Sequence, residues 1–212
     1  MAAPRPLLFG RGPLPWLVPA LVAGGLVPLA SLAIAAAHGQ LGANPIAEAM
    51  NQLGLIALIF LVASLGCTPL RTATGWAWPI RVRKTLGLFA FFYAALHLAV
   101  YAALDQGLAL RAIVDDVVRR PFITLGFAAF LLRVPLAVTS TADMLKRLGA
   151  ARWKRLHRLA YLAAALGVAH FVLRVKRDLG EPVAYGTALA VLLLARVVTW
   201  AATRRAKGSA AL

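Results

Sequence analysis

The sequence predicts an all-α membrane protein, a bundle of six transmembrane helices. Of its 212 residues, 61% are hydrophobic and only 14% are charged, and the mean hydropathy is +0.79. Such values lie far outside those of soluble domains. Six apolar runs, each long enough to cross a hydrocarbon core about 30 Å thick, are separated by short polar loops. The net charge of +16 comes mostly from basic clusters between these runs, so it indicates membrane topology and not nucleic-acid binding.

The six expected spans follow one another with short connections. The first comes after a basic tail, but its apolar run is too long for the core of a signal peptide, so we expect it to be retained. Pro121 stands at the first turn of the fourth span, where its missing N–H costs nothing, and Pro135 is expected to kink that span. The spans are expected at residues 14–37, 51–70, 85–104, 121–139, 152–174 and 182–202. They form one domain, 14–202, between terminal tails at 1–13 and 203–212.

The distribution of basic residues predicts the orientation. The amino-terminal tail, the second and fourth loops and the carboxyl-terminal tail together hold fourteen Lys and Arg, whereas the first, third and fifth loops hold six. Because cytoplasmic loops carry an excess of Lys and Arg, both termini are expected in the cytoplasm. Six of the seven acidic residues fall on the opposite side and leave that face near neutral. The outer face is therefore the better candidate for meeting a soluble partner.

Histidines are the candidate functional residues, because ligand-type side chains inside a membrane are costly and histidine is the commonest metal ligand. His157 and His170 lie on the fifth span, about 20 Å apart along a helix and about 140° apart around it unless the helix bends. His97, on the third span, lies about 10 Å from the outer end of its helix, at a depth comparable to that of His170. These two histidines are therefore predicted to supply both axial ligands of one haem iron. His157 has no matching histidine in the inner leaflet, and His38 is expected in a loop.

Other polar groups have less specific assignments. Arg83 precedes His97 by fourteen residues, which returns to nearly the same helix face, so it is a candidate partner for a haem propionate. Arg133, in the middle of the fourth span, either reaches the cytoplasmic edge or pairs with a propionate. The lone Cys67 excludes an intramolecular disulfide and is expected to pack as a small apolar residue. For each histidine, a hydrogen-bonded packing role is the alternative to metal binding.

Several segments resemble the MsrQ (YedZ) family of membrane proteins. They lie between His38 and Arg174 and carry all three membrane histidines. Long matches of this kind are more specific than any isolated motif. The matching segments are HGQLGANP after the first span, PIRVRKTLGLFAFFYAALHLAVY through the third, RPFITLGFAAF and PLAVTST in the fourth, and LGAARWKRLHRLAYLAAALGVAHF through the fifth.

The resemblance implies a ferric-reductase-like transmembrane domain that binds b-type haem, one or two per chain, and also FMN. The three histidines of the family match His97, His157 and His170. His97 and His170 would hold the outer haem iron, and His157 the inner one. In the wider group of ferric reductases and NADPH oxidases, the third span carries a second histidine near its cytoplasmic end. Arg83 or a neighbour occupies that place here, so the second ligand of the inner haem stays open.

The resemblance also implies an electron-transfer subunit of the bacterial inner membrane that is not itself the catalytic subunit. Electrons would pass from the quinone pool or a cytoplasmic flavoprotein to a periplasmic molybdenum-containing methionine-sulfoxide reductase, which repairs oxidised periplasmic proteins. Two alternatives stay open, a stand-alone ferric-reductase-like cytochrome b and a haem-free transport or structural protein. The first needs a nucleotide-binding unit, for which the sequence has neither the glycine motif nor the room. The second is not supported by any repeat halves of the kind found in transporters.

Overall fold

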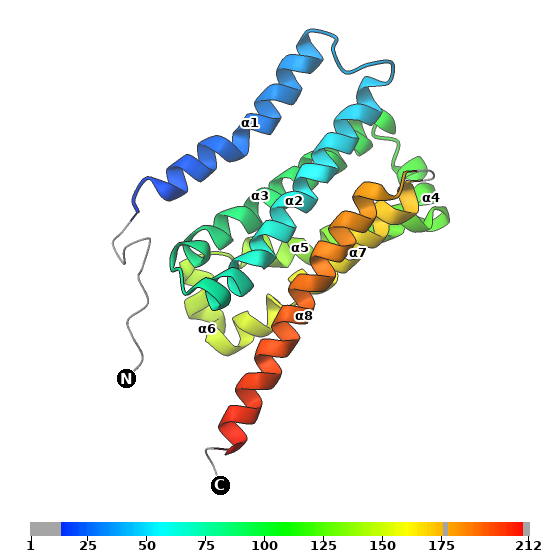
Figure 1. Cartoon of the computed structure of the whole chain (residues 1–212). Helices are drawn as coiled ribbons and strands as arrows, with labels where there is room; N and C mark the ends of the chain where they lie inside the picture. The colour runs from blue at the N-terminus through cyan, green and yellow to red at the C-terminus, as the bar shows by residue number, and fades with distance from the viewer. Residues whose placement is uncertain (1–13, 176–177, 210–212) are drawn as a thin grey trace.

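The computed structural model describes residues 14–175 and 178–209, and the regular secondary structure in these ranges is helical (Figure 1). The predicted amino-terminal tail, 1–13, lies outside the described residues, as do the last three residues of the predicted carboxyl-terminal tail. A single π-helical turn, η1, continues α3. The elements are α1 (Leu17–Ala37), α2 (Pro45–Thr74), α3 (Trp78–Val100), η1 (Tyr101–Asp105), α4 (Leu110–Arg119), α5 (Pro121–Val138), α6 (Ala142–Leu156), α7 (Leu159–Arg174) and α8 (Gly180–Ser209).

Within the described residues, five helices are long and apolar enough to cross a membrane, and a sixth span results if the bent pair α6 and α7 counts as one. The chain is therefore a multi-pass membrane protein, and the predicted all-α class is confirmed. Its outward side chains are largely apolar. On α8, for example, Val191, Leu194 and Val198 are more than half exposed, as expected of a helix that faces lipid.

Two helices, α2 and α3, begin before the apolar runs that predicted them. α2 starts at Pro45, earlier than predicted, because the Asn44 side chain accepts a hydrogen bond from the Ala47 amide (3.1 Å) and proline fits the first turn. α3 starts at Trp78, so the predicted loop up to Lys84 is partly helical. The third predicted loop likewise contains the short helix α4.

The prediction of one helix from Arg152 to Arg174 is wrong. α6 ends at Leu156, α7 begins at Leu159, and the two helices are bent by 42° with His157 at the break. The physical reason is the charge of α6, whose basic side chains are exposed and would be costly to place in hydrocarbon. These side chains are Lys146, Arg147, Arg152, Lys154 and Arg155.

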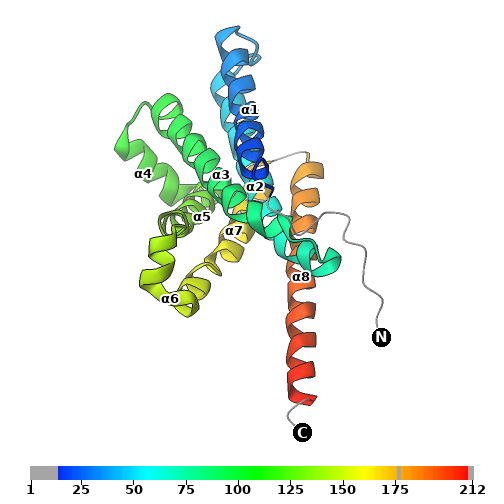
Figure 2. The same cartoon turned by 90° about the vertical axis from the view of Figure 1, so that its left-hand side faces the viewer.

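Two ends of the bundle can be distinguished. Figures 1 and 2 both place the α1–α2 connection and α4 toward one end, here named the α4 end, and α6 at the other, here named the α6 end. α2 and α3 pack along one another at the centre, α5 packs on α7, and α8 packs on α7 and α2. This arrangement leaves room inside the bundle between α2, α3, α5 and α7.

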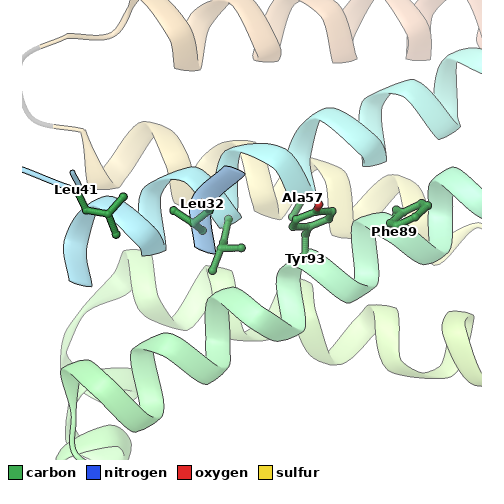
Figure 3. Packing of buried hydrophobic residues seen from close by; sticks show 6 residues of the cluster. Leu32, Leu41, Ala57, Phe89 and Tyr93 are labelled. Atoms are coloured by element: carbon green, nitrogen blue, oxygen red, sulfur yellow. The ribbon is translucent and has the colours of Figure 1, made fainter. Parts of the chain in front are cut away.

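Two buried clusters hold the helices together. The first joins α1, α2 and α3, and Figure 3 shows Tyr93 of α3 beside Ala57 of α2. The second joins α2, α3, α7 and α8, and there Ala90 and Ala164 are fully buried. Small residues allow membrane helices to approach closely, and α7 packs against α2 at this cluster. The clusters consist of Leu32, Leu41, Leu53, Ala57, Phe89 and Tyr93, and of Leu61, Leu65, Ala90, Ala164 and Leu189.

Candidate functional site

Two cavities lie inside the bundle, one toward each end. The first cavity has a volume of about 360 Å³ and is lined by α2, α3, η1, α4, α5 and α7. His97 of α3 and His170 of α7 both line it, and their ring centroids are 6.2 Å apart with the ring planes at 81°. The expectation that these two histidines lie at comparable depth and meet is confirmed.

The separation of the two rings fits a shared metal ion. A bond from a metal to an imidazole nitrogen is about 2.0 Å long, and the ring centre lies about 1.2 Å behind that nitrogen, so two imidazoles on opposite sides of one ion have centroids about 6.3 Å apart. The observed 6.2 Å agrees with this value. The distance therefore agrees with a shared metal ion and also with an edge-to-face contact between the two rings.

Each of these rings is oriented by a backbone carbonyl. His97 Nδ1 lies 2.8 Å from the Met50 carbonyl oxygen of α2, and His170 Nδ1 lies 2.6 Å from the Phe122 carbonyl oxygen of α5. A carbonyl oxygen only accepts, so Nδ1 carries the proton in both rings and Nε2 keeps its lone pair. A carbonyl bonded to the far nitrogen is the usual arrangement around a histidine that binds a metal.

A glycine makes room for each ring. Gly54 stands four residues after Met50, and Gly126 stands four residues after Phe122, so each glycine lies one turn beyond the carbonyl that the histidine contacts. A Cβ atom at Gly54 would lie 3.1 Å from His97 Nδ1, and one at Gly126 would lie 2.7 Å from His170 Nδ1. The same local device therefore seats both histidines.

Cationic groups lie at the α4 end of the first cavity. Arg120 and Arg174 line it, and Arg120 Nη1 donates to an Asp116 carboxylate oxygen at 3.3 Å. The Tyr101 hydroxyl donates to the same oxygen at 3.0 Å and so joins η1 to α4. These arginines are candidate partners for an anionic group at the cavity mouth.

The second cavity, of about 500 Å³, lies toward the α6 end and contains His157 and Arg83. The His157 ring stacks on Trp153 at a centroid distance of 3.7 Å, and its Nδ1 lies 3.1 Å from the Trp153 carbonyl oxygen. Its Nε2 lies 3.5 Å from the Ser140 hydroxyl, which already donates its proton to the Leu136 carbonyl. The Nε2 lone pair is therefore without a donor from Ser140.

The structure thus sorts the predicted site residues into two groups. His97 and His170 share the first cavity, His157 and Arg83 share the second, and no other histidine lines the second cavity. His38 ends α1 and is exposed, outside both cavities. In the part of the chain that the structure describes, no group of three or more His, Cys, Asp or Glu side chains is placed to hold a metal ion.

Sequence reasoning missed the glycines and the arginines of the first cavity. Gly54 and Gly126 interrupt apolar helical runs, a pattern that signals close approach of another group, but the sequence does not say which group approaches. The sequence places Arg120 in the third loop and Arg174 at the end of the fifth span, where both indicate only topology. Their place at the cavity follows from the helix packing, which brings the α5 start and the α7 end together.

Comparison with known proteins identifies the family. Residues 49–168 match the family model described as ferric reductase like transmembrane component. The chain is 50% identical to the protein-methionine-sulfoxide reductase heme-binding subunit MsrQ of Deinococcus radiodurans, over 91% of this chain and 95% of that protein. It is 51% identical to the protein of the same name from Rhodospirillum rubrum, over 87% and 88%, and 47% identical to that of Herminiimonas arsenicoxydans, over 90% and 88%. The chain therefore belongs to the family of MsrQ heme-binding subunits, which has a ferric-reductase-like transmembrane domain.

Proposed function

We propose that this chain is the haem-binding electron-transfer subunit of a protein-methionine-sulfoxide reductase system. The observation that carries the proposal is the pair His97 and His170, whose rings are 6.2 Å apart across a cavity inside the bundle. The printed names of the relatives, which are heme-binding subunits of that reductase, support it. Buried histidine pairs of this kind hold a haem iron from both sides.

In this proposal His97 and His170 hold the iron of one b-type haem through Nε2. When bound, the haem supplies one-electron redox chemistry, and the protein sets its potential through ligand type, burial and hydrogen bonding. The Met50 and Phe122 carbonyls fix the two rings through Nδ1. Arg120 and Arg174 are placed to pair with its carboxylates at the α4 end.

A second haem is proposed for the second cavity, with His157 as one ligand. Arg83 donates from Nη1 to the Thr68 hydroxyl at 3.3 Å and lines the same cavity. Because an arginine stays protonated, it is suited to a haem carboxylate and not to iron. The second ligand of this inner iron is left open.

The direction of electron flow follows from the proposed orientation. With both termini in the cytoplasm, the second cavity lies toward the cytoplasm and the first toward the periplasm. Electrons enter from quinol or a cytoplasmic flavoprotein and leave to a periplasmic molybdenum-containing methionine-sulfoxide reductase. In this proposal the electron-transfer domain is the transmembrane region 14–202 in the bacterial inner membrane. The segments 1–13 and 203–212 are its cytoplasmic tails.

The experiment is haem quantitation with reduced and oxidised optical spectra of the purified protein and four histidine variants. His97→Ala and His170→Ala are expected to lose the same spectral component, because they would bind the same iron, and His157→Ala a different one. His38→Ala is the matched control, since His38 lies outside both cavities. A wild-type protein without haem after haem-replete expression contradicts the proposal, and an unchanged spectrum for His170→Ala contradicts the ligand pair.

Two finer parts of the proposal have their own tests. FMN, which the family resemblance alone implies, is tested by the fluorescence of flavin released on denaturation of the purified protein. Transfer to the proposed partner is tested by mixing the reduced protein with the oxidised periplasmic reductase and following haem reoxidation. Reoxidation that requires the partner, and that continues beyond a single turnover of the partner only when a methionine-sulfoxide substrate is present, supports the electron-transfer role. Reoxidation that does not depend on the partner contradicts it.

A further inference from the structure

Arg133 of α5 lies in the wall between the two cavities. Its side chain lines both of them, and the residue is only 7% exposed. Leu61 of α2 also lines both cavities. Beside them, Phe130 of the first cavity stacks on Phe91 of the second at 5.5 Å. One buried cation therefore separates two candidate cofactor sites.

The hydrogen bonding of this guanidinium is incomplete. Nη2 donates to the Gly87 carbonyl of α3 at 3.0 Å, whereas Nε is buried without a hydrogen-bond partner. The ion pairs found among the described residues join Arg120 to Asp116 and Lys146 to Asp143, so Arg133 takes part in neither. A buried charge without a counter-charge is strongly unfavourable.

Snorkelling does not account for Arg133. A long basic side chain can lower its cost by extending to the aqueous edge, but this one is almost fully buried and contacts a backbone carbonyl of the central helix α3. An anion at the cavity wall would accept a hydrogen bond from Nε and compensate the positive charge. A carboxylate satisfies both at once, because it accepts paired hydrogen bonds from a guanidinium.

We propose that Arg133 binds a carboxylate of the haem in the second cavity and acts as a fixed positive charge between the two sites. The inference rests on the proposed function, because haem brings the carboxylates that the described protein residues do not supply here. A cation near an iron stabilises the reduced form more than the oxidised form, since reduction removes one positive charge. Arg133 therefore raises the reduction potential of a haem in either cavity and favours its reduced form.

The test compares three substitutions at this position in the haem-loaded protein. Arg133→Met removes the charge and the donors, Arg133→Gln keeps a donor for the Gly87 carbonyl but no charge, and Arg133→Lys keeps the charge. Arg111→Met is the matched control, because Arg111 is exposed and lines neither cavity. The readouts are the midpoint potentials from a spectroscopic redox titration and the rate of haem loss.

We expect Arg133→Met and Arg133→Gln to lower the midpoint potential of a haem. Haem binding should weaken roughly tenfold, because each variant loses one charge-assisted hydrogen bond. Arg133→Lys should keep most of the potential. If Arg133→Gln behaves like the wild type, the residue serves only as a donor to Gly87 and the proposal is wrong. Potentials and haem loss equal to those of Arg111→Met overturn it as well. A wild-type protein that holds no haem would instead defeat the proposed function itself.

Discussion

At the scale of single residues, the candidate site depends on the backbone carbonyl and the glycine that position each histidine ring. The His97 and His170 rings come from different helices, yet each donates from Nδ1 to a carbonyl four residues before a glycine. The carbonyl fixes the tautomer, and the glycine lets the ring approach the helix. Both rings then keep the Nε2 lone pair that a metal requires.

Of the two glycines, Gly126 leaves less space for a side chain beside its histidine ring. Gly126→Ala would place a Cβ 2.7 Å from His170 Nδ1, so the ring must move away from the Phe122 carbonyl. Haem affinity is expected to fall roughly 10-fold or more, as for other changes to groups that orient a ligating histidine. The measurement is haem retention and the optical spectrum of the purified variant. Gly54→Ala, with 3.1 Å to His97 Nδ1, should have a smaller effect.

Gly24→Ala is the matched control for this prediction. A Cβ at Gly24, which also lies within a helix, meets nothing within 4 Å. Both substitutions gain about 1 kcal/mol of helix propensity, so a difference between them reports the contact with His170. If both variants retain haem equally, the glycine has no part in seating the ring.

Individual residues could be predicted from the sequence only where their chemistry is unusual for a membrane. His97 and His170 were found because histidine within an apolar span is costly and because their depths match. Gly54 and Gly126 could not be predicted as site residues, because a glycine has no reactive side chain and its role depends on the side chain that faces it. The iron ligation itself stays a prediction until haem is measured.

At the scale of helices, one side chain of α3 adds hydrogen bonds to the apolar packing of α1 on the bundle. The Tyr93 hydroxyl donates to the Gly25 carbonyl at 2.6 Å and accepts from the Leu29 amide at 3.2 Å. These are the two backbone groups that an uninterrupted helix would join directly. Next to them, the Phe89 ring occupies the space where a Cβ at Gly25 would lie. A fully buried tyrosine therefore docks α1 by entering its hydrogen-bond ladder.

Removing that hydroxyl should weaken the contact between α1 and α3. Tyr93→Phe is expected to lower the free energy of unfolding by about 1 kcal/mol, the usual size for hydrogen bonds between membrane helices. The measurement is a denaturant titration of the protein in detergent. Tyr185→Phe, on α8 and away from this contact, serves as the control. Equal stability of the Tyr93→Phe variant and the wild type would show that α1 closes its own hydrogen bond when the hydroxyl is absent.

The helical type of the spans was predictable, but the short helix α4 and the separate helix α6 were not, and the fifth span was not predictable in shape. The sequence predicts one span from Arg152 to Arg174, which includes three of the basic residues of α6. In the structure these residues belong to a separate helix, and His157 lies at the 42° bend. The 140° phase difference expected for one straight helix does not apply to His157 and His170, because the bend places them on different helices. Hydropathy along the chain carries no information on such angles.

At the scale of the whole molecule, charge and architecture point to the same division between two sides. α6 and the α1–α2 connection lie at opposite ends of the bundle (Figure 1). α6 carries five exposed Lys and Arg side chains, whereas the α1–α2 connection has none. The positive-inside rule therefore predicts that the α6 end lies in the cytoplasm. The first cavity, with His97 and His170, would open toward the periplasm, where an electron acceptor can reach it.

This orientation can be tested with single cysteines, because the chain has one cysteine and it is buried. In a Cys67→Ala background, Gln40→Cys and Asp115→Cys place exposed thiols at the α4 end, and Lys146→Cys places one on α6. A membrane-impermeant maleimide added to cells with a permeabilised outer membrane should label the first two. Lys146→Cys should react only after the inner membrane is broken, and the Cys67→Ala protein should stay unlabelled. The reverse pattern would invert the bundle and turn the His97 and His170 pair toward the cytoplasm. A pair facing that way would be on the electron-entry side, so delivery to a periplasmic partner would have to occur from the His157 cavity instead.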